Sequence, residues 1–294
     1  MQALLDALVT GLAQGAMIAL VALGYSMVYG VLKLINFAHS EVFMMGAFAG
    51  FYLLNALGGA DHPVLAAVCG TLGAMALAAA LGVLVERIAY RPLRERSRGR
   101  ASGNVRVTPL VTALGVSVLL KNVAQLAFTA RYKSYPQLFG HTRLLIFVVT
   151  LVTMGLLQLL VHRTWTGKAM RALSANVEAA RLMGVRTGRI IAFTFAVGSG
   201  LAALGSVLYC LDQSQAYPTM GEVIGTRAFV AAVLGGIGSI PGAVLGGGLI
   251  GILGELAKLT QYSGGQDVLV FFVLIVVLLV KPAGLLGKTG SEKV

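Results

Sequence analysis

Long apolar runs dominate the pattern of hydrophobic and polar positions along the chain. Most of these runs approach the roughly 20 residues that a helix needs to cross a bilayer. They lie at about 4–32, 35–57, 63–85, 107–130, 144–161, 189–210, 226–240, 242–259 and 268–280. The pattern predicts an all-α fold, a polytopic transmembrane helix bundle with about 8–10 spans, some of them broken or re-entrant. We expect a single membrane domain over residues 1–294.

Composition agrees with this prediction. Hydrophobic residues make up 57% of the chain and charged residues only 12%, whereas an average soluble domain carries roughly 25% charged residues. No long polar stretch remains for a separate soluble domain. The small-residue spacings Gly11–Gly15, Gly46–Gly50, Gly242–Gly246 and Gly247–Gly251 predict close helix packing within the chain.

The positive charges are concentrated beside the apolar runs. The formal net charge is +12, and most of the 23 Lys and Arg lie in the segments 87–106 and 163–189 and in the tail from Lys281. Basic connectors between spans remain on the cytoplasmic side. We therefore expect a multi-pass protein of the bacterial cytoplasmic (inner) membrane, with its N-terminus outside and its C-terminus in the cytoplasm. The lipid bilayer, and no nucleic acid, is the expected partner of these charges.

Motifs for enzymatic chemistry are weak or missing. Gly287-Lys288-Thr289 suggests a phosphate loop, but Pro282 stands where that motif needs Gly, and only five residues follow. The two cysteines, Cys69 and Cys210, form neither a disulfide framework nor a zinc signature. We expect no metal site, no cofactor and no ATPase site in this chain.

Three polar residues interrupt the second apolar run, namely Asn36, His39 and Glu41. Such residues are costly in lipid and must face protein, water or the interface. They favour a broken helix that lines a solute pathway. The alternative is a short cytoplasmic or interfacial turn beside Lys33.

A second interruption is rich in glycine and contains a proline. It comprises Gly235, Gly236, Gly238, Ser239 and Pro241. Gly and Pro free backbone groups that must be buried in protein or line a cavity. Interrupted segments in the two halves of a chain indicate a transport site between repeats, and we assign these residues to the same pathway. The alternative interpretation is a tight helical hairpin.

The second basic connector, residues 162–189, predicts a short cytoplasmic helix. Asn176 suits an N-cap, Glu178 suits the positive end of a helix, and Gly184 suits its end. Glu178, Ala179, Ala180 and Gly184 form the motif Glu-Ala-Ala-x-x-x-Gly. This motif is the core of the loop that ABC importer permeases insert into their ATPases. The alternative is an amphipathic helix on the anionic inner leaflet.

Nearly the whole chain resembles the LivH-type permeases of high-affinity branched-chain amino acid ABC importers. The similar stretches are Gly24–Gly30, Ile35–Glu41, Glu86–Pro92, Glu178–Gly184 and Ala228–Gly248. Two departures are Ser40, where the family usually has Gly, and the absence of an Ile-x-Leu-Pro after the coupling motif.

The resemblance implies a transport subunit that forms half of a pathway for leucine, isoleucine and valine. It also implies a second permease of the LivM type, two cytoplasmic ATPases that bind ATP and Mg²⁺, and a periplasmic amino-acid-binding protein. Asn176, Glu178, Ala179, Ala180 and Gly184 would then couple this chain to an ATPase.

Other function classes stay open at this point. Urea and short-chain amide ABC permeases are similar. A stand-alone ion-coupled secondary transporter would also explain the interrupted segments, with His39, Glu41 and Glu255 as ion-relay residues. A membrane-embedded enzyme would need a catalytic constellation that the residues do not supply.

Overall fold

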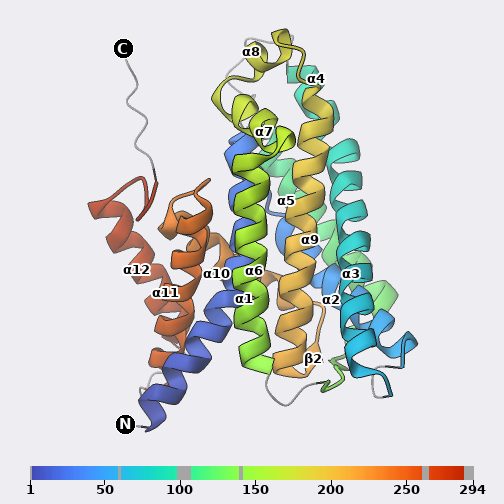
Figure 1. The fold of residues 1–294 in the computed structure, drawn as a ribbon, viewed down its shortest axis with the longest axis vertical. Helices are drawn as coiled ribbons and strands as arrows, with labels where there is room; N and C mark the ends of the chain where they lie inside the picture. The colour runs from blue at the N-terminus through green and yellow to red at the C-terminus, as the bar shows by residue number, and fades with distance from the viewer. Residues whose placement is uncertain (1, 59–60, 98–106, 139–141, 260–264, 288–294) are drawn as a thin grey trace.

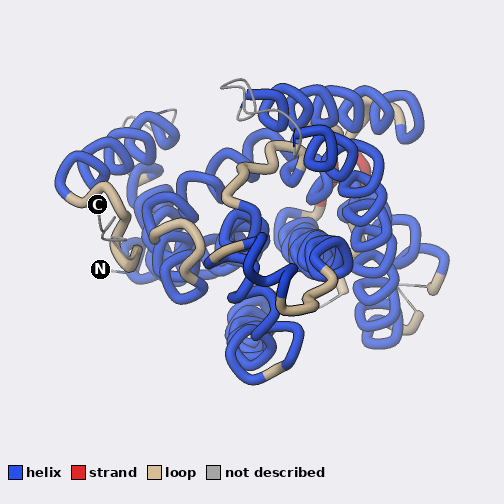
Figure 2. Tube along the Cα trace, turned by 90° about the horizontal axis from the view of Figure 1, so that it is seen from above, coloured by secondary structure: helices blue, strands red, loops and turns tan. Residues whose placement is uncertain are grey.

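The computed structural model describes residues 2–58, 61–97, 107–138, 142–259 and 265–287. Most of the helices run roughly along one long axis (Figure 1), and the view from above shows some of them end-on and others inclined to that axis (Figure 2). The helical elements are α1 Gln2–Leu32, α2 His39–Ala56, α3 Pro63–Val85, the π-helical turn η1 Glu86–Tyr90, α4 Arg91–Ser97, α5 Val107–Phe128, α6 Thr142–Arg163, α7 Trp165–Ala175, α8 Val177–Leu182, α9 Thr187–Gln213, α10 Met220–Gly235, α11 Ile240–Lys258 and α12 Gln266–Val280. Two short antiparallel strands, β1 Lys133–Ser134 and β2 Gln215–Ala216, complete the described fold.

Six helical segments are long and apolar enough to cross a membrane by length and composition. They comprise α1, α3 with its continuation to Arg94, α5, α6, α9 and α11. Helices α2, α10 and α12 are shorter or less apolar and complete the predicted set of runs. The all-α, multi-pass prediction is confirmed.

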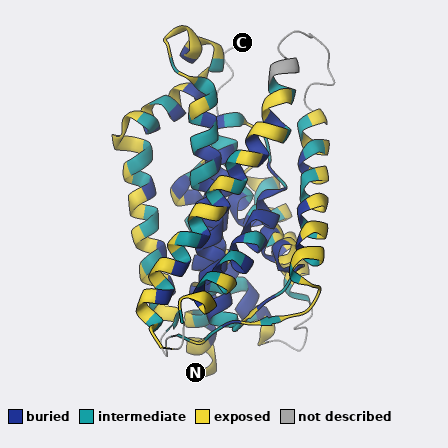
Figure 3. Cartoon of the chain, turned by 90° about the vertical axis from the view of Figure 1, so that its right-hand side faces the viewer, coloured by how far each residue is buried: buried dark blue, intermediate teal, exposed yellow. Residues whose placement is uncertain are grey.

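Helices α1 and α9 form the centre of the bundle. In each of them 72% of the most apolar window is buried, against 17% in α5 and in α6. A helix that is apolar all round and enclosed by neighbours belongs to a core. Figure 3 shows this arrangement, with buried residues in the middle of the bundle and exposed ones on the outer helices. The exposed apolar side chains of the outer helices suit contact with lipid.

The chain contains an inverted structural repeat. Helices α1, α2 and α3 correspond in order to α9, α10 and α11, and a six-residue connector (33–38 and 214–219) precedes the second helix of each set. The packing is reciprocal, because α1 lies on α11 while α9 lies on α3, and α2 lies on α9 while α10 lies on α1. Helices α1 and α9 run in opposite directions (Figure 1), so the two sets have inverted topology.

Glycines allow the closest helix contacts, as the small-residue spacings predict. A Cβ on Gly15 of α1 would lie 2.7 Å from the carbonyl oxygen of Gly247 in α11. Gly11 and Gly251 meet one turn further along the same pair of helices. The other two predicted spacings also pack within the chain, Gly46–Gly50 against α9 and Gly242–Gly246 against α10.

Two helical segments differ from the sequence-based expectation. The connector 162–189 contains the additional helix α7, which begins at the N-cap Thr164, whose hydroxyl accepts a hydrogen bond from the Gly167 amide at 3.0 Å. Met170 and Leu173 of α7 are buried, but basic residues interspersed among them conceal this apolar face in the sequence. The third span also continues beyond Val85 through η1 and α4, and the predicted cytoplasmic residues Arg98, Arg100 and Arg106 lie outside the described part of the chain.

Candidate functional site

Helices α2 and α10 begin inside the bundle and pass each other in opposite directions. Their first residues are buried, including Ser40 of α2 and Gly221 of α10. A Cβ on Gly221 would lie 2.5 Å from the Ser40 carbonyl oxygen, and a Cβ on Gly225 would collide with the Ser40 side chain. The two glycines therefore let the N-terminal turns overlap. We call this contact the α2–α10 crossing. Ser40 adopts helical backbone geometry here, so the usual family glycine is not needed for a positive φ.

Asn36 holds the start of α2 in place. Its Oδ1 accepts hydrogen bonds from the Ala38 amide at 3.1 Å and from the Tyr90 hydroxyl at 2.8 Å. Asn36 and Tyr90 are 5% and 4% exposed. The contact connects the 33–38 connector to the π-helical turn η1, an element that occurs frequently at functional sites. Asn36 is thus a positioning residue.

His39 packs into the core against α1. Its ring centroid is 4.7 Å from that of Tyr25 in an edge-to-face arrangement, and its Nε2 has no hydrogen-bond partner in the described structure. A Cβ on Gly24 would collide with the imidazole ring. The side chain is 1% exposed and does not line the cavity described next. The structure therefore separates His39 from Glu41, although the two are close in sequence.

A cavity of about 290 Å³ opens beside the α2–α10 crossing, between α1, α2, α5 and α10. Its lining combines charged, hydroxyl and apolar side chains. The polar ones are Tyr25, Ser40, Glu41, Ser117, Lys121, Glu222 and Thr226, and the apolar ones are Phe37, Leu114, Val118 and Phe229. Small-molecule sites have this mixture of apolar walls and a few polar groups.

Three charged groups define the electrostatics of the cavity. Glu41 is 3% exposed, its Oε1 accepts a hydrogen bond from the Ser117 hydroxyl at 3.3 Å, and its Oε2 is buried without a partner in the described structure. Lys121 Nζ lies 2.6 Å from Glu222 Oε2. Glu41 and Glu222 are each the third residue of their helices. They are equivalent positions of the repeat, and both face positive helix ends.

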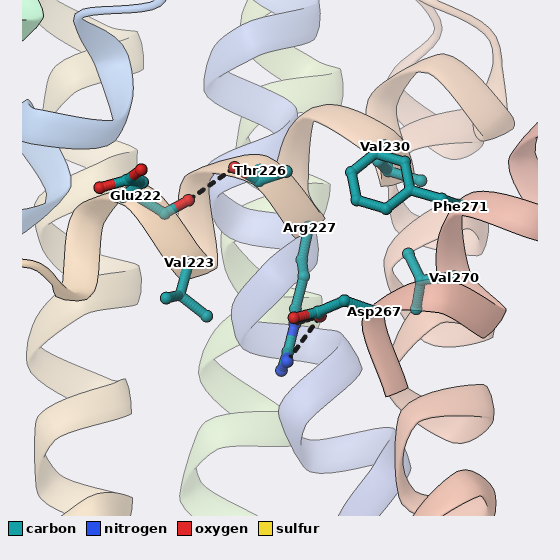
Figure 4. Close-up of a pocket in the computed structure, with 8 residues that line it drawn as sticks. All are labelled: Glu222, Val223, Thr226, Arg227, Val230, Asp267, Val270 and Phe271. Atoms are coloured by element: carbon teal, nitrogen blue, oxygen red, sulfur yellow. Dashed lines mark hydrogen bonds and ion pairs between the residues drawn. The ribbon is translucent and has the colours of Figure 1, made fainter. Parts of the chain in front are cut away.

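A second pocket, of about 230 Å³, lies on the other side of α10. Figure 4 shows Arg227 of α10 directed at Asp267 of α12, with Val270 and Phe271 beside them. The Arg227–Asp267 ion pair measures 2.8 Å, and Glu222 lines both pockets. Charged residues at membrane depth face protein or water rather than lipid. The open side of α10 is therefore suited to a polar pathway or to another protein subunit.

The segment from Gly235 to Pro241 forms the turn of the α10–α11 hairpin. Gly236 and Gly238 have φ values of +103° and +90°, which glycine adopts without strain. Ser239 caps α11 by accepting a hydrogen bond from the Gly242 amide at 3.2 Å, and Pro241 lies in the first turn, where no helical hydrogen bond is lost. The segment is therefore a tight helical hairpin, which was the alternative interpretation of its sequence.

The expected pairing of the two interrupted segments is therefore corrected. The connector 33–38 corresponds to 214–219 and not to Gly235–Pro241, because each of these connectors joins a long central helix to a short one. Gly235, Gly236, Gly238, Ser239 and Pro241 do not line the cavity beside Glu41. Instead, the segment after α12 covers the hairpin, since the Leu285 and Leu286 amides donate to the carbonyl oxygens of Leu234 and Gly235 at 2.8 and 2.9 Å.

Helix α8 has the predicted caps. Asn176 Oδ1 accepts hydrogen bonds from the amides of Glu178 and Ala179 at 2.9 and 3.0 Å, and Gly184 has a φ of +83°. Ala180 is buried, so this side of α8 faces the protein. Leu182 and Met183 are 88% and 84% exposed at the end of the molecule that also carries α7 and α4 (Figure 1). A cleft of about 480 Å³ beside α8 is rich in arginine, including Arg87, Arg181 and Arg186.

Sequence reasoning did not include Ser117, Lys121 or Glu222 in the site. Lys121 was recognisable as a charge within an apolar run. Glu222 could have been found from its place after a six-residue connector, which matches that of Glu41. Ser117 carries no such signal, because a hydroxyl in a transmembrane helix usually bonds to its own backbone.

Comparisons with known proteins identify relatives along nearly the whole sequence. The family model for "Branched-chain amino acid transport system / permease component" matches residues 7–279. The permease protein BraD of the high-affinity branched-chain amino acid transport system of Pseudomonas aeruginosa is 39% identical, covering 99% of this chain and 98% of its own length. Its counterpart LivH of Escherichia coli (strain K12) is 38% identical, covering 99% and 97%. A probable LivH of Methanocaldococcus jannaschii is 27% identical over 92% of this chain and 89% of its own.

A sugar permease is a more distant relative of this chain. The ribose import permease protein RbsC of Bacillus subtilis is 31% identical over 49% of this chain. No solved structure matches the chain. The match of the family model over most of the sequence, together with the two near-full-length relatives, decides the assignment. The chain belongs to the family of permease components of branched-chain amino acid transport systems.

Proposed function

We propose that this chain is a permease subunit of an ABC importer and forms half of the pathway for leucine, isoleucine and valine. The observation that carries the proposal is similarity along almost the entire chain to permeases of branched-chain amino acid transport systems. The partly polar cavity at the α2–α10 crossing adds support, because it lies among the short helices that start inside the bundle. Such broken helices form solute sites in transporters.

The proposed assembly contains a second permease of the LivM type, two cytoplasmic ATPases and a periplasmic amino-acid-binding protein. ATP and Mg²⁺ are bound by the ATPases, and this chain contributes no ATPase site. Helix α8 supports the proposal, because Leu182 and Met183 are almost fully exposed at the end of the molecule that carries basic residues. A short helix with an exposed apolar end suits a groove on a partner protein.

In the proposed orientation the N-terminus is outside and the C-terminus is cytoplasmic. The basic residues beside α4, α8 and the start of α9 support this direction. Helix α12 runs toward that end of the molecule (Figure 1). The bacterial inner membrane is the proposed location.

Coupling in this proposal runs from α8 into the bundle. Movement of the ATPases acts on α8 and, through the adjoining α7 and α9, on the central helices. The Tyr90–Asn36 hydrogen bond then transmits motion of η1 to the start of α2, where Glu41 lines the cavity. Two states of the α2–α10 crossing would expose the cavity to opposite sides of the membrane.

Uptake measurements test this function. The chain is expressed with its partner subunits in a bacterium that lacks its own branched-chain amino acid permeases, and uptake of labelled leucine is followed. Vanadate, which blocks ABC ATPases, should abolish uptake, whereas dissipation of the proton and sodium gradients at constant ATP should leave it intact. Uptake that persists with vanadate and collapses with the ion gradients would establish the secondary-transporter alternative. Competition by urea or acetamide, but not by isoleucine or valine, would establish the amide alternative.

A further inference from the structure

We propose that the cavity at the α2–α10 crossing binds the charged head group of a free α-amino acid, with Glu41 holding the ammonium group and Lys121 the carboxylate. This inference rests on the proposed function and locates, within this chain, the point at which the solute is held during its passage.

The Glu41 carboxylate is suited to an ammonium group. The residue is 3% exposed, and its Oε2 is buried without a hydrogen-bond partner in the described structure. Burial of an unsatisfied polar oxygen is unfavourable, and among the described residues the Glu41 carboxylate accepts a hydrogen bond only from the neutral Ser117 hydroxyl. The nearby ammonium group of Lys121 is directed to Glu222 at 2.6 Å instead. A ligand ammonium group, which donates hydrogen bonds and carries positive charge, would complete the coordination of Glu41.

Lys121 is suited to a carboxylate. Its ion pair with Glu222 is partly open, with the two side chains 31% and 65% exposed. A partly exposed pair contributes little net stability because water screens it. A ligand carboxylate can therefore replace Glu222 as the partner of Lys121 without a large loss. Ser117 and Lys121 are four residues apart on α5 and lie on the same face of that helix. The Ser117 hydroxyl donates to the Glu41 carboxylate. The Glu41 carboxylate, the Ser117 hydroxyl and the Lys121 ammonium group therefore follow one another along the wall of the cavity.

The size and the remaining walls of the cavity define the rest of the ligand. About 290 Å³ is close to the lower end of the range for small-molecule pockets. Phe37, Leu114, Val118 and Phe229 provide an apolar surface beside the charged groups. With its acids and its lysine ionised, the cavity carries one excess negative charge, which disfavours a purely anionic solute. A purely cationic solute would leave Lys121 without a new partner.

Ligand analogues test the assignment of each charge. The transport complex that contains this chain is placed in nanodiscs without binding protein, and weak binding is measured by saturation-transfer NMR. The probes are L-leucine, leucine methyl ester, which lacks the carboxylate charge, and 4-methylpentanoate, which lacks the amino group. The unmodified complex should bind leucine at least about tenfold more tightly than either analogue, since each analogue loses one charge-assisted contact.

Two variants should then show opposite patterns. Glu41→Gln should weaken leucine and the methyl ester at least about tenfold and leave 4-methylpentanoate unchanged. Lys121→Met should weaken leucine and 4-methylpentanoate by a similar factor and leave the methyl ester unchanged. Glu255→Gln and Lys258→Met are matched controls, because this ion pair in α11 lies outside the cavity. Both control variants should bind all three probes as the unmodified complex does.

The contrary outcomes separate the site from the function. The site is refuted if the unmodified complex does not bind leucine, or if Glu41→Gln and Lys121→Met weaken all three probes equally, as general structural damage would. ATP-driven import of leucine with added binding protein is measured in parallel on the same preparation. Import without the predicted binding pattern would overturn this site alone, whereas failure of import would overturn the proposed function.

Discussion

At the scale of single residues, Asn36 connects two elements through one amide oxygen. Its Oδ1 accepts from both the Ala38 amide and the Tyr90 hydroxyl, so Tyr90→Phe removes one of two bonds and leaves the other. We expect this variant to lose about 1 kcal/mol of stability, the usual worth of a hydrogen bond, and to transport more slowly because η1 is released from α2. Thermal unfolding of the purified protein and initial uptake rates measure the two effects.

Tyr52→Phe is the matched control for that prediction. Tyr52 is 45% exposed on α2, and its ring lies beside those of Phe51 and Phe128. The control removes the same hydroxyl oxygen, but from an exposed tyrosine of α2 instead of the buried Tyr90 of η1. An equal effect of both substitutions on unfolding and uptake would show that the Asn36 contact has no special importance.

At the scale of the elements, the α2–α10 crossing depends on the absence of a side chain at Gly225. Gly225→Ala places a methyl group against Ser40, and we expect a loss of about 1–3 kcal/mol from overpacking. Ser40→Gly in the same chain should restore part of this stability. Gly115→Ala is the control, because in the described structure no atom outside its own stretch of α5 lies within 4 Å of its Cβ position. The measurement compares the unfolding temperatures of the unmodified protein, Gly225→Ala, the double variant with Ser40→Gly, and Gly115→Ala. Equal stability of Gly225→Ala and Gly115→Ala would show that α2 and α10 are further apart.

Helix α8 allows a prediction about coupling that is separate from folding. Glu178 lies in the first turn, and Glu178→Arg replaces a favourable charge at the positive helix end by an unfavourable one, at a cost of about 1 kcal/mol or less. The protein should still reach the membrane in normal amount, while uptake falls severalfold because the proposed contact with an ATPase is altered. Immunoblots of membranes and uptake assays provide the measurements, with Glu178→Gln as the neutral control. Normal uptake by Glu178→Arg would remove Glu178 from the coupling surface.

The sequence predicted those elements whose local signals are complete. Apolar length alone located α3 at Pro63–Val85, and caps at Asn176 and Gly184 located α8. Helix α7 was missed because its buried Met170 and Leu173 are interspersed with basic residues. Of the candidate site, Glu41 was found because a carboxylate in an apolar run is conspicuous. Its contact with Ser117 could not be predicted, since the two residues are 76 positions apart and meet only through tertiary packing.

At the scale of the whole molecule, the inverted repeat is a property of packing rather than of sequence. The two sets of helices show no convincing sequence similarity, yet the reciprocal contacts of α1 with α11 and of α9 with α3 relate them. This symmetry accounts for the position of the cavity. Two equivalent helices that start inside the bundle bring Glu41 and Glu222 to the wall of the same cavity. An alternating-access mechanism uses such symmetry, because one half can adopt the conformation of the other.

Labelling of single cysteines tests the orientation of the molecule in the membrane. In a background with Cys69→Ala and Cys210→Ala, single cysteines are introduced as Asp61→Cys, Lys133→Cys, Gly188→Cys and Pro282→Cys. If the basic end of the bundle is cytoplasmic, a membrane-impermeant maleimide should label the first two variants in cells with a permeabilised outer membrane. It should label the last two only after the inner membrane is opened as well. These positions lie in connectors or near helix ends at the two ends of the bundle, so the substitutions should cost little stability. The opposite labelling pattern would place α8 outside the cell, where it could not contact an ATPase, and would contradict the proposed coupling together with the orientation.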